Sequence, residues 1–218
     1  MAGKVTMPIE EGVVLYGDLV VPPGAFALVI FSHGSGSSRF SMRNRHVAEV
    51  LNKERIATLL TDLLTEEEDR NYDSRFDIDR ITERLIKITT LMRQRPDLEE
   101  MKIGFFGAST GAASALRAAA ALGSAVHAVV SRGGRPDLAG EGITRVKAPT
   151  LLLVGSLDNG VIRLNRNAFA SLRCERRLDI IPGASHLFVE PGKLDEVARL
   201  ASGWFTKYLH PDPVLKLV

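Results

Sequence analysis

The 218-residue sequence contains a single cysteine, Cys174, and this scarcity excludes several kinds of site. One thiol forms no internal disulfide and no cysteine-rich metal site. Structural disulfides belong mainly to oxidising compartments, so their absence favours a reducing one. We therefore expect a cytoplasmic protein.

Long apolar runs and dense basic runs are missing as well. No stretch reaches the roughly 18 apolar residues that cross a bilayer, and residues 1–12 lack the apolar core of a signal peptide. The 28 Lys and Arg residues nearly balance 26 Asp and Glu residues, which leaves a net charge of +2. The sequence therefore predicts a protein that binds neither membranes nor nucleic acid.

Short apolar runs rich in β-branched residues alternate with segments whose apolar residues recur every three or four positions. This alternation predicts an α/β fold with a mostly parallel, eight-stranded twisted sheet and helices on both faces. The expected strands are Lys4–Ile9, Val13–Val20, Ala27–Phe31, Ile56–Leu60, Lys102–Phe106, Ala128–Ser131, Thr150–Val154 and Leu178–Ile181. The expected helices are Arg43–Lys53, Ile78–Met92, Ser109–Leu122, Val161–Leu172 and Leu194–Tyr208. No repeat or linker divides the chain, so we expect one domain over residues 1–218, with the acidic segment Glu66–Arg75 as a solvated loop.

One expected strand runs into a helix through the sequence Gly107-Ala108-Ser109-Thr110-Gly111. A Gly-x-Ser-x-Gly pattern at a strand-to-helix turn places the serine on strained backbone, where its hydroxyl stands clear of the sheet. The glycines let strand and helix approach each other. Ser109 is therefore a candidate nucleophile, and the alternative is a serine that only caps the helix.

A serine nucleophile needs a base and a group that orients the base. His186 lies just after the last expected strand, and Asp158 follows the strand before it. The carboxyl ends of parallel strands meet at one edge of a sheet, where ligand sites gather. Ser109, Asp158 and His186 are thus a candidate triad. The alternatives are a helix-capping aspartate and a loop histidine without a chemical role.

An oxyanion formed at this serine needs two N–H donors. The backbone N–H of Thr110, directly after the nucleophile, is the first. The second is expected from the loop Ser32–Ser38, whose glycines allow a backbone N–H to turn towards the serine, and we assign it to Ser35. His33 in this loop is expected to be structural.

These motifs together resemble those of the α/β-hydrolases, and within them the small, single-domain dienelactone-hydrolase-like group. They are Ser32-His33-Gly34-Ser35-Gly36-Ser37-Ser38, Gly107-Ala108-Ser109-Thr110-Gly111, Gly155-Ser156-Leu157-Asp158 and Pro182-Gly183-Ala184-Ser185-His186-Leu187-Phe188. One position departs from the group, because dienelactone hydrolases proper use a cysteine nucleophile. Cys174 follows a helix between the acid and the base and is not expected to replace Ser109. The resemblance therefore implies the hydrolysis of carboxylic esters in general.

Access to the pocket can also be inferred from the resemblance. A lid domain in this fold is usually inserted after the sixth strand, but the stretch from Arg132 to Ala148 holds only about 17 residues, too few for a bundle of ordinary helices. We expect no large lid domain and an open or lightly covered pocket shaped by Ser35–Arg45 and Glu66–Arg75.

Arginines flank the loops at this edge: Arg39, Arg43, Arg45, Arg132 and Arg135. A guanidinium that faces the pocket would recognise an anionic substrate, because arginine pairs bidentately with carboxylate or phosphate. An arginine paired with a neighbouring acid, such as Arg135 with Asp137, would not. Arg39, Arg132 and Arg135 are the candidate substrate-binding residues, with both interpretations open.

The sequence as a whole predicts a serine-dependent hydrolase of small-molecule carboxylic esters that uses no metal and no other cofactor. A thioesterase, an acyltransferase or a small-peptide hydrolase would use the same triad. A non-catalytic binding module with this fold is the alternative from another class.

Overall fold

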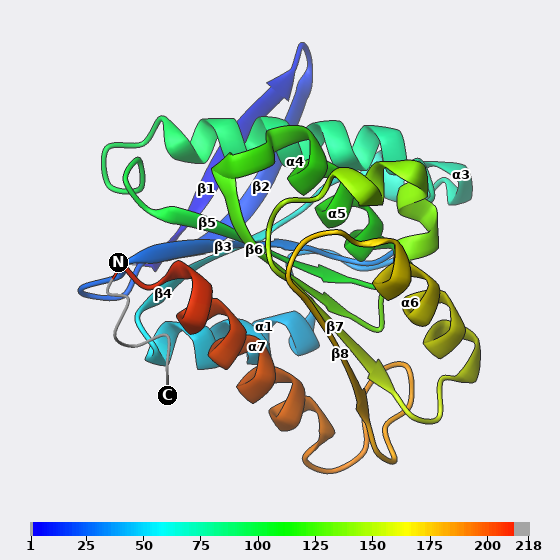
Figure 1. The fold of residues 1–218 in the computed structure, drawn as a ribbon. Coiled ribbons are helices and arrows are strands. Elements are labelled where there is room, and N and C mark those ends of the chain that lie inside the picture. Colours follow the sequence, from blue (N-terminus) through cyan, green and yellow to red (C-terminus); the bar gives the residue numbers. More distant parts are fainter. Residues whose placement is uncertain (1, 212–218) are drawn as a thin grey trace.

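Strands of the chain form one twisted sheet in the order β1-β2-β4-β3-β5-β6-β7-β8 (Figure 1). The computed structural model describes residues 2–211. Its strands are β1 (Ala2–Glu10), β2 (Val13–Val20), β3 (Ala27–Ser32), β4 (Ile56–Thr61), β5 (Lys102–Ala108), β6 (Val126–Arg132), β7 (Thr150–Gly155) and β8 (Arg176–Ile181). Its helices are α1 (Met42–Lys53), α2 (Glu66–Asp69), α3 (Tyr72–Arg75), α4 (Ile78–Arg93), α5 (Thr110–Leu122), α6 (Asn159–Ser171) and α7 (Lys193–Leu209), with the 3₁₀ segments η1 (Gly123–Ala125) and η2 (Pro136–Arg145).

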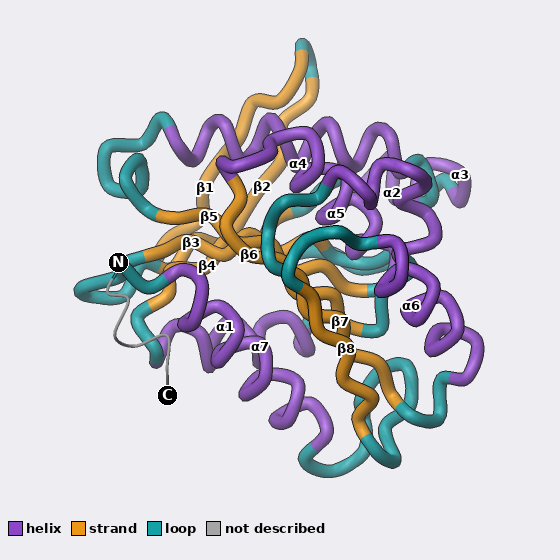
Figure 2. Tube along the Cα trace, viewed as in Figure 1, coloured by secondary structure: helices purple, strands orange, loops and turns teal. Residues whose placement is uncertain are grey.

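The sheet is mostly parallel, which confirms the predicted fold class. Only the pairs β1–β2 and β2–β4 are antiparallel, and the other neighbouring pairs of the described sheet are parallel. The β1–β2 hairpin extends well beyond the layers of helices (Figure 2). The connection between β6 and β7 contains only the short segment η2, in agreement with the expected lack of a large lid.

Helices cover both faces of the sheet because alternate residues of its buried central strands point to opposite sides. Helices α1 and α7 lie on one face, and α4, α5 and α6 lie on the other (Figure 1). Phe105 and its neighbour Phe106 illustrate the alternation, since they belong to two separate apolar clusters. The buried core on both faces holds the strand ends, and hence the loops that follow them, in fixed positions.

The segment Glu66–Arg75, expected as a loop, instead contains the helices α2 and α3. Thr65 forms a capping box with Glu68: its Oγ1 accepts the Glu68 N–H over 3.2 Å, and Glu68 Oε2 accepts the Thr65 N–H over 2.8 Å. Asn71 caps the second turn. The prediction was wrong because side-chain capping, and not an apolar period, supports these short helices.

Candidate active site

The predicted site residues meet at one edge of the sheet, where the carboxyl ends of β3, β5, β6, β7 and β8 are neighbours. Ser109 follows the central strand β5. Ser35 lies in the loop after β3, and Arg132 ends β6, so the two flank the serine. Asp158 and His186 follow β7 and β8. The carboxyl ends of five strands thus contribute to one site.

Ser109 occupies the strained turn that its motif predicts. Its φ of 52° and ψ of −123° lie outside the helical region, a conformation that costs a non-glycine residue about 1–3 kcal/mol. The loop after β6 holds it there: the Ser109 N–H donates to the carbonyl of Arg132 over 3.2 Å, and the Ser109 carbonyl accepts the Arg135 N–H over 2.9 Å. The Ser109 hydroxyl makes no capping bond to α5, unlike an ordinary N-cap serine. It is therefore available for chemistry.

The two glycines of the motif are required by close backbone approach. A Cβ at Gly111 would lie 2.2 Å from the carbonyl oxygen of Ser32, and one at Gly107 would lie 2.5 Å from Cα of Ala112. Helix α5 therefore packs directly against the ends of β3 and β5. This contact brings the loop that contains Ser35 to the start of the helix.

His186 and Asp158 form a close pair, with 2.6 Å between His186 Nδ1 and Asp158 Oδ2. The aspartate side chain is 16% exposed and the histidine side chain 39% exposed. Asp158 stands at the N-terminus of α6 but makes no capping bond with its side chain. A carboxylate that accepts from Nδ1–H leaves Nε2 as the proton acceptor, which is the tautomer a general base needs.

The His186 loop is held by polar contacts that the sequence analysis missed. Glu190 Oε2 accepts the N–H of Ser185 over 3.0 Å, and Ser156 Oγ accepts the N–H of Gly183 over 2.7 Å. Hydrogen bonding to Ser185, first with its side chain and then with its backbone N–H, holds the pKa of the Glu190 carboxyl below its usual range. No sequence motif predicts these two hydrogen bonds, because each joins a side chain to a backbone N–H whose position depends on how the loop folds.

Ser109 and His186 open into the same cavity, of about 250 Å³. The other residues that line it are Gly34, Ser35, Ser37, Ser41, Arg43, Asn44, Ala108, Arg132 and Leu187. Within residues 2–211, no hydrogen bond joins the Ser109 hydroxyl to His186. The candidate nucleophile and the candidate base therefore share a cavity without a hydrogen bond between them; catalytic hydrogen bonds are often long in a protein without bound substrate.

The expected oxyanion donors lie next to each other. The Ser35 N–H donates to the side-chain hydroxyl of Thr110 over 2.8 Å, so it already has an acceptor. The loop runs close to Ser109, and a Cβ at Gly34 would lie only 3.0 Å from Ser109 Cβ. An oxyanion would therefore share the Ser35 donor with the hydroxyl of Thr110.

His33 holds this loop and is not exposed to the cavity at Ser109. Its Nδ1 lies 2.9 Å from the carbonyl oxygen of Gly34, and its Nε2 lies 3.2 Å from the backbone nitrogen of Leu63. A neutral ring with its proton on Nδ1 satisfies both bonds. Burial lowers the pKa of His33 and so favours this neutral form. The structural role expected for His33 is confirmed.

Only one of the three candidate substrate-binding arginines lines the cavity at Ser109, and this is Arg132. Arg39 instead pairs with Asp62, and Arg135 pairs with Asp137 over 2.7 Å. Arg43, a flanking arginine that we did not select, also lines the cavity. A guanidinium's direction depends on its tertiary neighbours, so position along the chain does not distinguish these four residues.

A second, larger cavity of about 420 Å³ lies beside the first and shares Ser37 with it. Its walls include Tyr16, Arg39 and residues Glu66 and Asp69 of α2. The segment Glu66–Arg75 therefore borders this cavity and not the one at Ser109, which corrects the expected shape of the pocket.

Other kinds of site find little support in the described residues. Cys174 is half-buried in the connection between α6 and β8. Burial raises the pKa of its thiol, as expected for an unreactive cysteine. Residues 2–211 contain no group of three or more His, Cys, Asp or Glu side chains arranged for a metal ion. None of their helices combines the length and the apolar character needed to cross a bilayer.

Comparison with known proteins gives a consistent picture of the fold. The model of the dienelactone hydrolase family matches residues 43–207. A solved structure of a dienelactone hydrolase from Anabaena variabilis ATCC 29413 is 52% identical, with a TM-score of 0.92 over 96% of this chain and 99% of that chain. Est1E from Butyrivibrio proteoclasticus is 16% identical and shares the fold, with a TM-score of 0.80 over 94% of this chain and 98% of that chain.

Two curated sequences from Mycobacterium tuberculosis strains are 53% identical over 193 residues, or 88% of this chain. They come from strains CDC 1551 / Oshkosh and ATCC 25618 / H37Rv, and both are provisionally named as a phosphoribosyl transferase. The match covers 44% of each, so the chain spans less than half the length of these relatives.

Proposed function

This chain belongs to the dienelactone hydrolase family, as its motifs predicted, and we propose that it hydrolyses carboxylic esters through an acyl-enzyme on Ser109. One observation carries the proposal. The uncapped hydroxyl on the strained turn shares a cavity with His186, and Asp158 Oδ2 lies 2.6 Å from His186 Nδ1, where it supports the tautomer that a base needs. A turn that served only to cap a helix would need neither a base nor an orienting carboxylate.

In the proposed reaction, Ser109 Oγ bonds to the ester carbonyl carbon while its proton moves to His186 Nε2. The carbonyl electron pair moves onto the oxygen, and the resulting oxyanion accepts hydrogen bonds from the backbone N–H groups of Thr110 and Ser35. The bond to the alkoxy oxygen then breaks, and the departing alcohol takes the proton from His186. Water repeats both steps on the acyl-enzyme and releases the acid and free Ser109.

The nucleophile is proposed to be serine although the best-known members of the family use cysteine. Cys174 lies by Thr150, with 3.7 Å between its Sγ and Thr150 Oγ1, and it does not line the cavity of Ser109. The dienelactone substrate is therefore not assigned to this chain. The proposal concerns carboxylic esters as a class.

Other activities would use the same groups. Thioester hydrolysis, acyl transfer to an alcohol and peptide hydrolysis differ only in the leaving group or the acceptor. The transferase activity in the names of the mycobacterial relatives is not proposed here, because more than half of each relative lies outside the match.

The test compares wild-type protein with the Ser109→Ala variant. We expect wild-type protein to hydrolyse p-nitrophenyl acetate and a fluorophosphonate probe to label it at Ser109. The variant should lose both properties while its melting temperature changes little. Ester turnover at the wild-type rate in the variant would refute the serine mechanism, and a folded wild-type protein that resists the probe would indicate a non-catalytic binding module. Parallel assays with a thioester and an amide would establish the bond preference.

A further inference from the structure

Two arginine side chains in the cavity of Ser109 have no acidic partner. Arg132 is 6% exposed, and its Nε and Nη1 atoms are buried without a hydrogen-bond partner in the described structure. Arg43, near the start of α1, likewise has a buried Nε without a partner. Neither residue forms an ion pair within residues 2–211, and the residues that line the cavity include no Asp or Glu. This cavity therefore concentrates positive charge that the chain does not neutralise.

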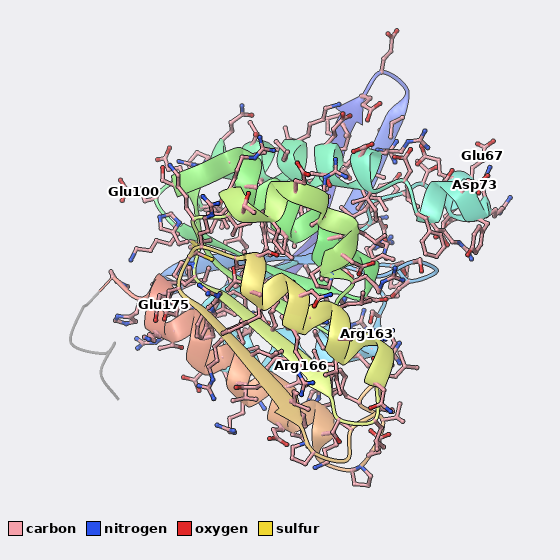
Figure 3. The ribbon with its side chains drawn as sticks, turned by 45° about the vertical axis from the view of Figure 1, so that its right-hand side comes forward. Glu67, Asp73, Glu100, Arg163, Arg166 and Glu175 are labelled. Atoms are coloured by element: carbon pink, nitrogen blue, oxygen red, sulfur yellow. The ribbon has the colours of Figure 1, made fainter. Side chains whose placement is uncertain are left out.

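Other arginines of the described structure are paired with acids or exposed to solvent, which makes the contrast informative. The other buried arginine, Arg84, binds Glu68 through two hydrogen bonds of 2.6 and 2.8 Å. Arg163 and Arg166 lie on the outer surface of α6 (Figure 3), where water solvates their charges. Arg132 Nε and Nη1, in contrast, are buried and have no hydrogen-bond partner among the described residues.

Burying such a charge is unfavourable unless a ligand compensates it. Desolvation, and then the nearby charge of Arg43, lower the pKa of Arg132 to about 10. The guanidinium nevertheless stays protonated at neutral pH. The fold thus maintains two like charges next to the nucleophile, a destabilising arrangement that is typical of a binding site.

We propose that Arg132 and Arg43 bind a phosphate group carried by the ester substrate. This inference rests on the proposed function, because it places the phosphate in the cavity of Ser109. A phosphate monoester carries a charge of about −1.5 to −2, which matches two guanidiniums, and its three terminal oxygens suit several N–H donors. A carboxylate would neutralise only one of them.

The small cavity restricts the distance between the phosphate and the ester. Ser109, His186 and the two arginines share about 250 Å³, so the scissile carbonyl and the phosphate must belong to one compact molecule. We therefore expect phosphorylated esters with short acyl groups as substrates, and we expect inorganic phosphate to occupy the same subsite.

Binding of inorganic phosphate can be measured separately from turnover. In Ser109→Ala, isothermal titration should detect phosphate binding, and acetate should bind at least tenfold more weakly. Introducing Arg132→Met or Arg43→Gln into that background should weaken phosphate binding at least tenfold. Arg45→Gln is the matched control, because Arg45 lies on the same helix, has 41% of its side chain exposed and does not line the cavity. It should leave phosphate binding within twofold of the parent.

Melting temperatures separate a binding role from a structural one. Arg132→Met removes a buried unpaired charge, so its melting temperature should stay equal or rise while phosphate binding is lost. If this variant fails to fold, Arg43→Gln decides the question alone. The proposal is overturned if phosphate and acetate bind equally, if phosphate does not bind at 10 mM, or if Arg45→Gln weakens binding as much as Arg43→Gln.

The two proposals fail in different ways. Turnover of p-nitrophenyl acetate that depends on Ser109 but is insensitive to phosphate would refute the phosphate site and support the esterase activity. Phosphate binding that depends on both arginines, in a protein that does not turn over esters, would support the phosphate site and refute the esterase activity.

Discussion

The backbone N–H of Ser35 donates to the side-chain hydroxyl of Thr110 over 2.8 Å. This bond joins the loop after β3 to the first residue of α5, which follows the neighbouring strand β5 and Ser109. Both residues are the proposed oxyanion donors, so the hydroxyl of one sets the direction of the other. The loop is further fixed by His33, which bonds Gly34 and Leu63.

Replacing Thr110 with valine should therefore slow the chemical step. Valine keeps the shape of threonine but removes the acceptor that orients the Ser35 N–H. Loss of a whole oxyanion donor typically costs roughly 100- to 1,000-fold in kcat, and a misdirected donor should cost part of that, roughly tenfold. Thr110→Ser retains the hydroxyl and should stay near wild type. Steady-state kinetics with p-nitrophenyl acetate tests this, and an unchanged or higher kcat in Thr110→Val would show that the hydroxyl merely competes with the oxyanion.

Asp158→Asn should lower kcat by roughly 1,000- to 10,000-fold with little change in fold, because an amide no longer enforces the Nδ1–H tautomer of His186. A matched control is Asp195→Asn. Asp195 forms another histidine–aspartate pair, with 2.8 Å between His46 Nε2 and its Oδ1; that pair joins α1 to α7, and neither residue lines the cavity of Ser109. Turnover should stay within twofold in the control. Similar losses in both variants would mean that Asp158 acts only through stability.

The sequence was a good guide to the strands and the longer helices, but not to the short, side-chain-capped helices α2 and α3. The expected strands and helices lie close to the observed ones, because apolar period and breakers act within a few residues. Gly107 and Gly111 correctly indicated the turn at Ser109. A side chain at either position would collide with backbone atoms. The positions of Asp158 and His186 just after two expected strands also indicated that these residues lie close together.

Long-range side-chain contacts could not be predicted in the same way. In the sequence, Arg39 and Arg135 were as good candidates for the cavity as Arg132, but in the structure they pair with Asp62 and Asp137. Arg43 and the bond between Ser35 and Thr110 likewise depend on packing between elements distant in sequence. The direction in which a side chain points, rather than its type, decides which residues form the site.

The ion pair of Glu68 with Arg84 yields a prediction about stability and pH. Hydrogen bonds from Arg84 are the main cause that lowers the pKa of Glu68 from 4.5 to about 2, and the Glu68 side chain is 22% exposed. A carboxyl whose pKa is depressed by folding stabilises the protein above its unfolded pKa, and this stabilisation is lost as pH falls from about 4.5 towards 2. At about 1.4 kcal/mol per pKa unit, Glu68→Gln should lower the free energy of unfolding by about 3 kcal/mol at pH 7 and by almost nothing near pH 2. Urea unfolding across this pH range measures the difference.

Asp97→Asn, which breaks the exposed pair of Asp97 with Arg95, should change stability by less than about 0.5 kcal/mol at pH 7. A loss in Glu68→Gln that is independent of pH would show that the pair stabilises the helices through shape and not through charge.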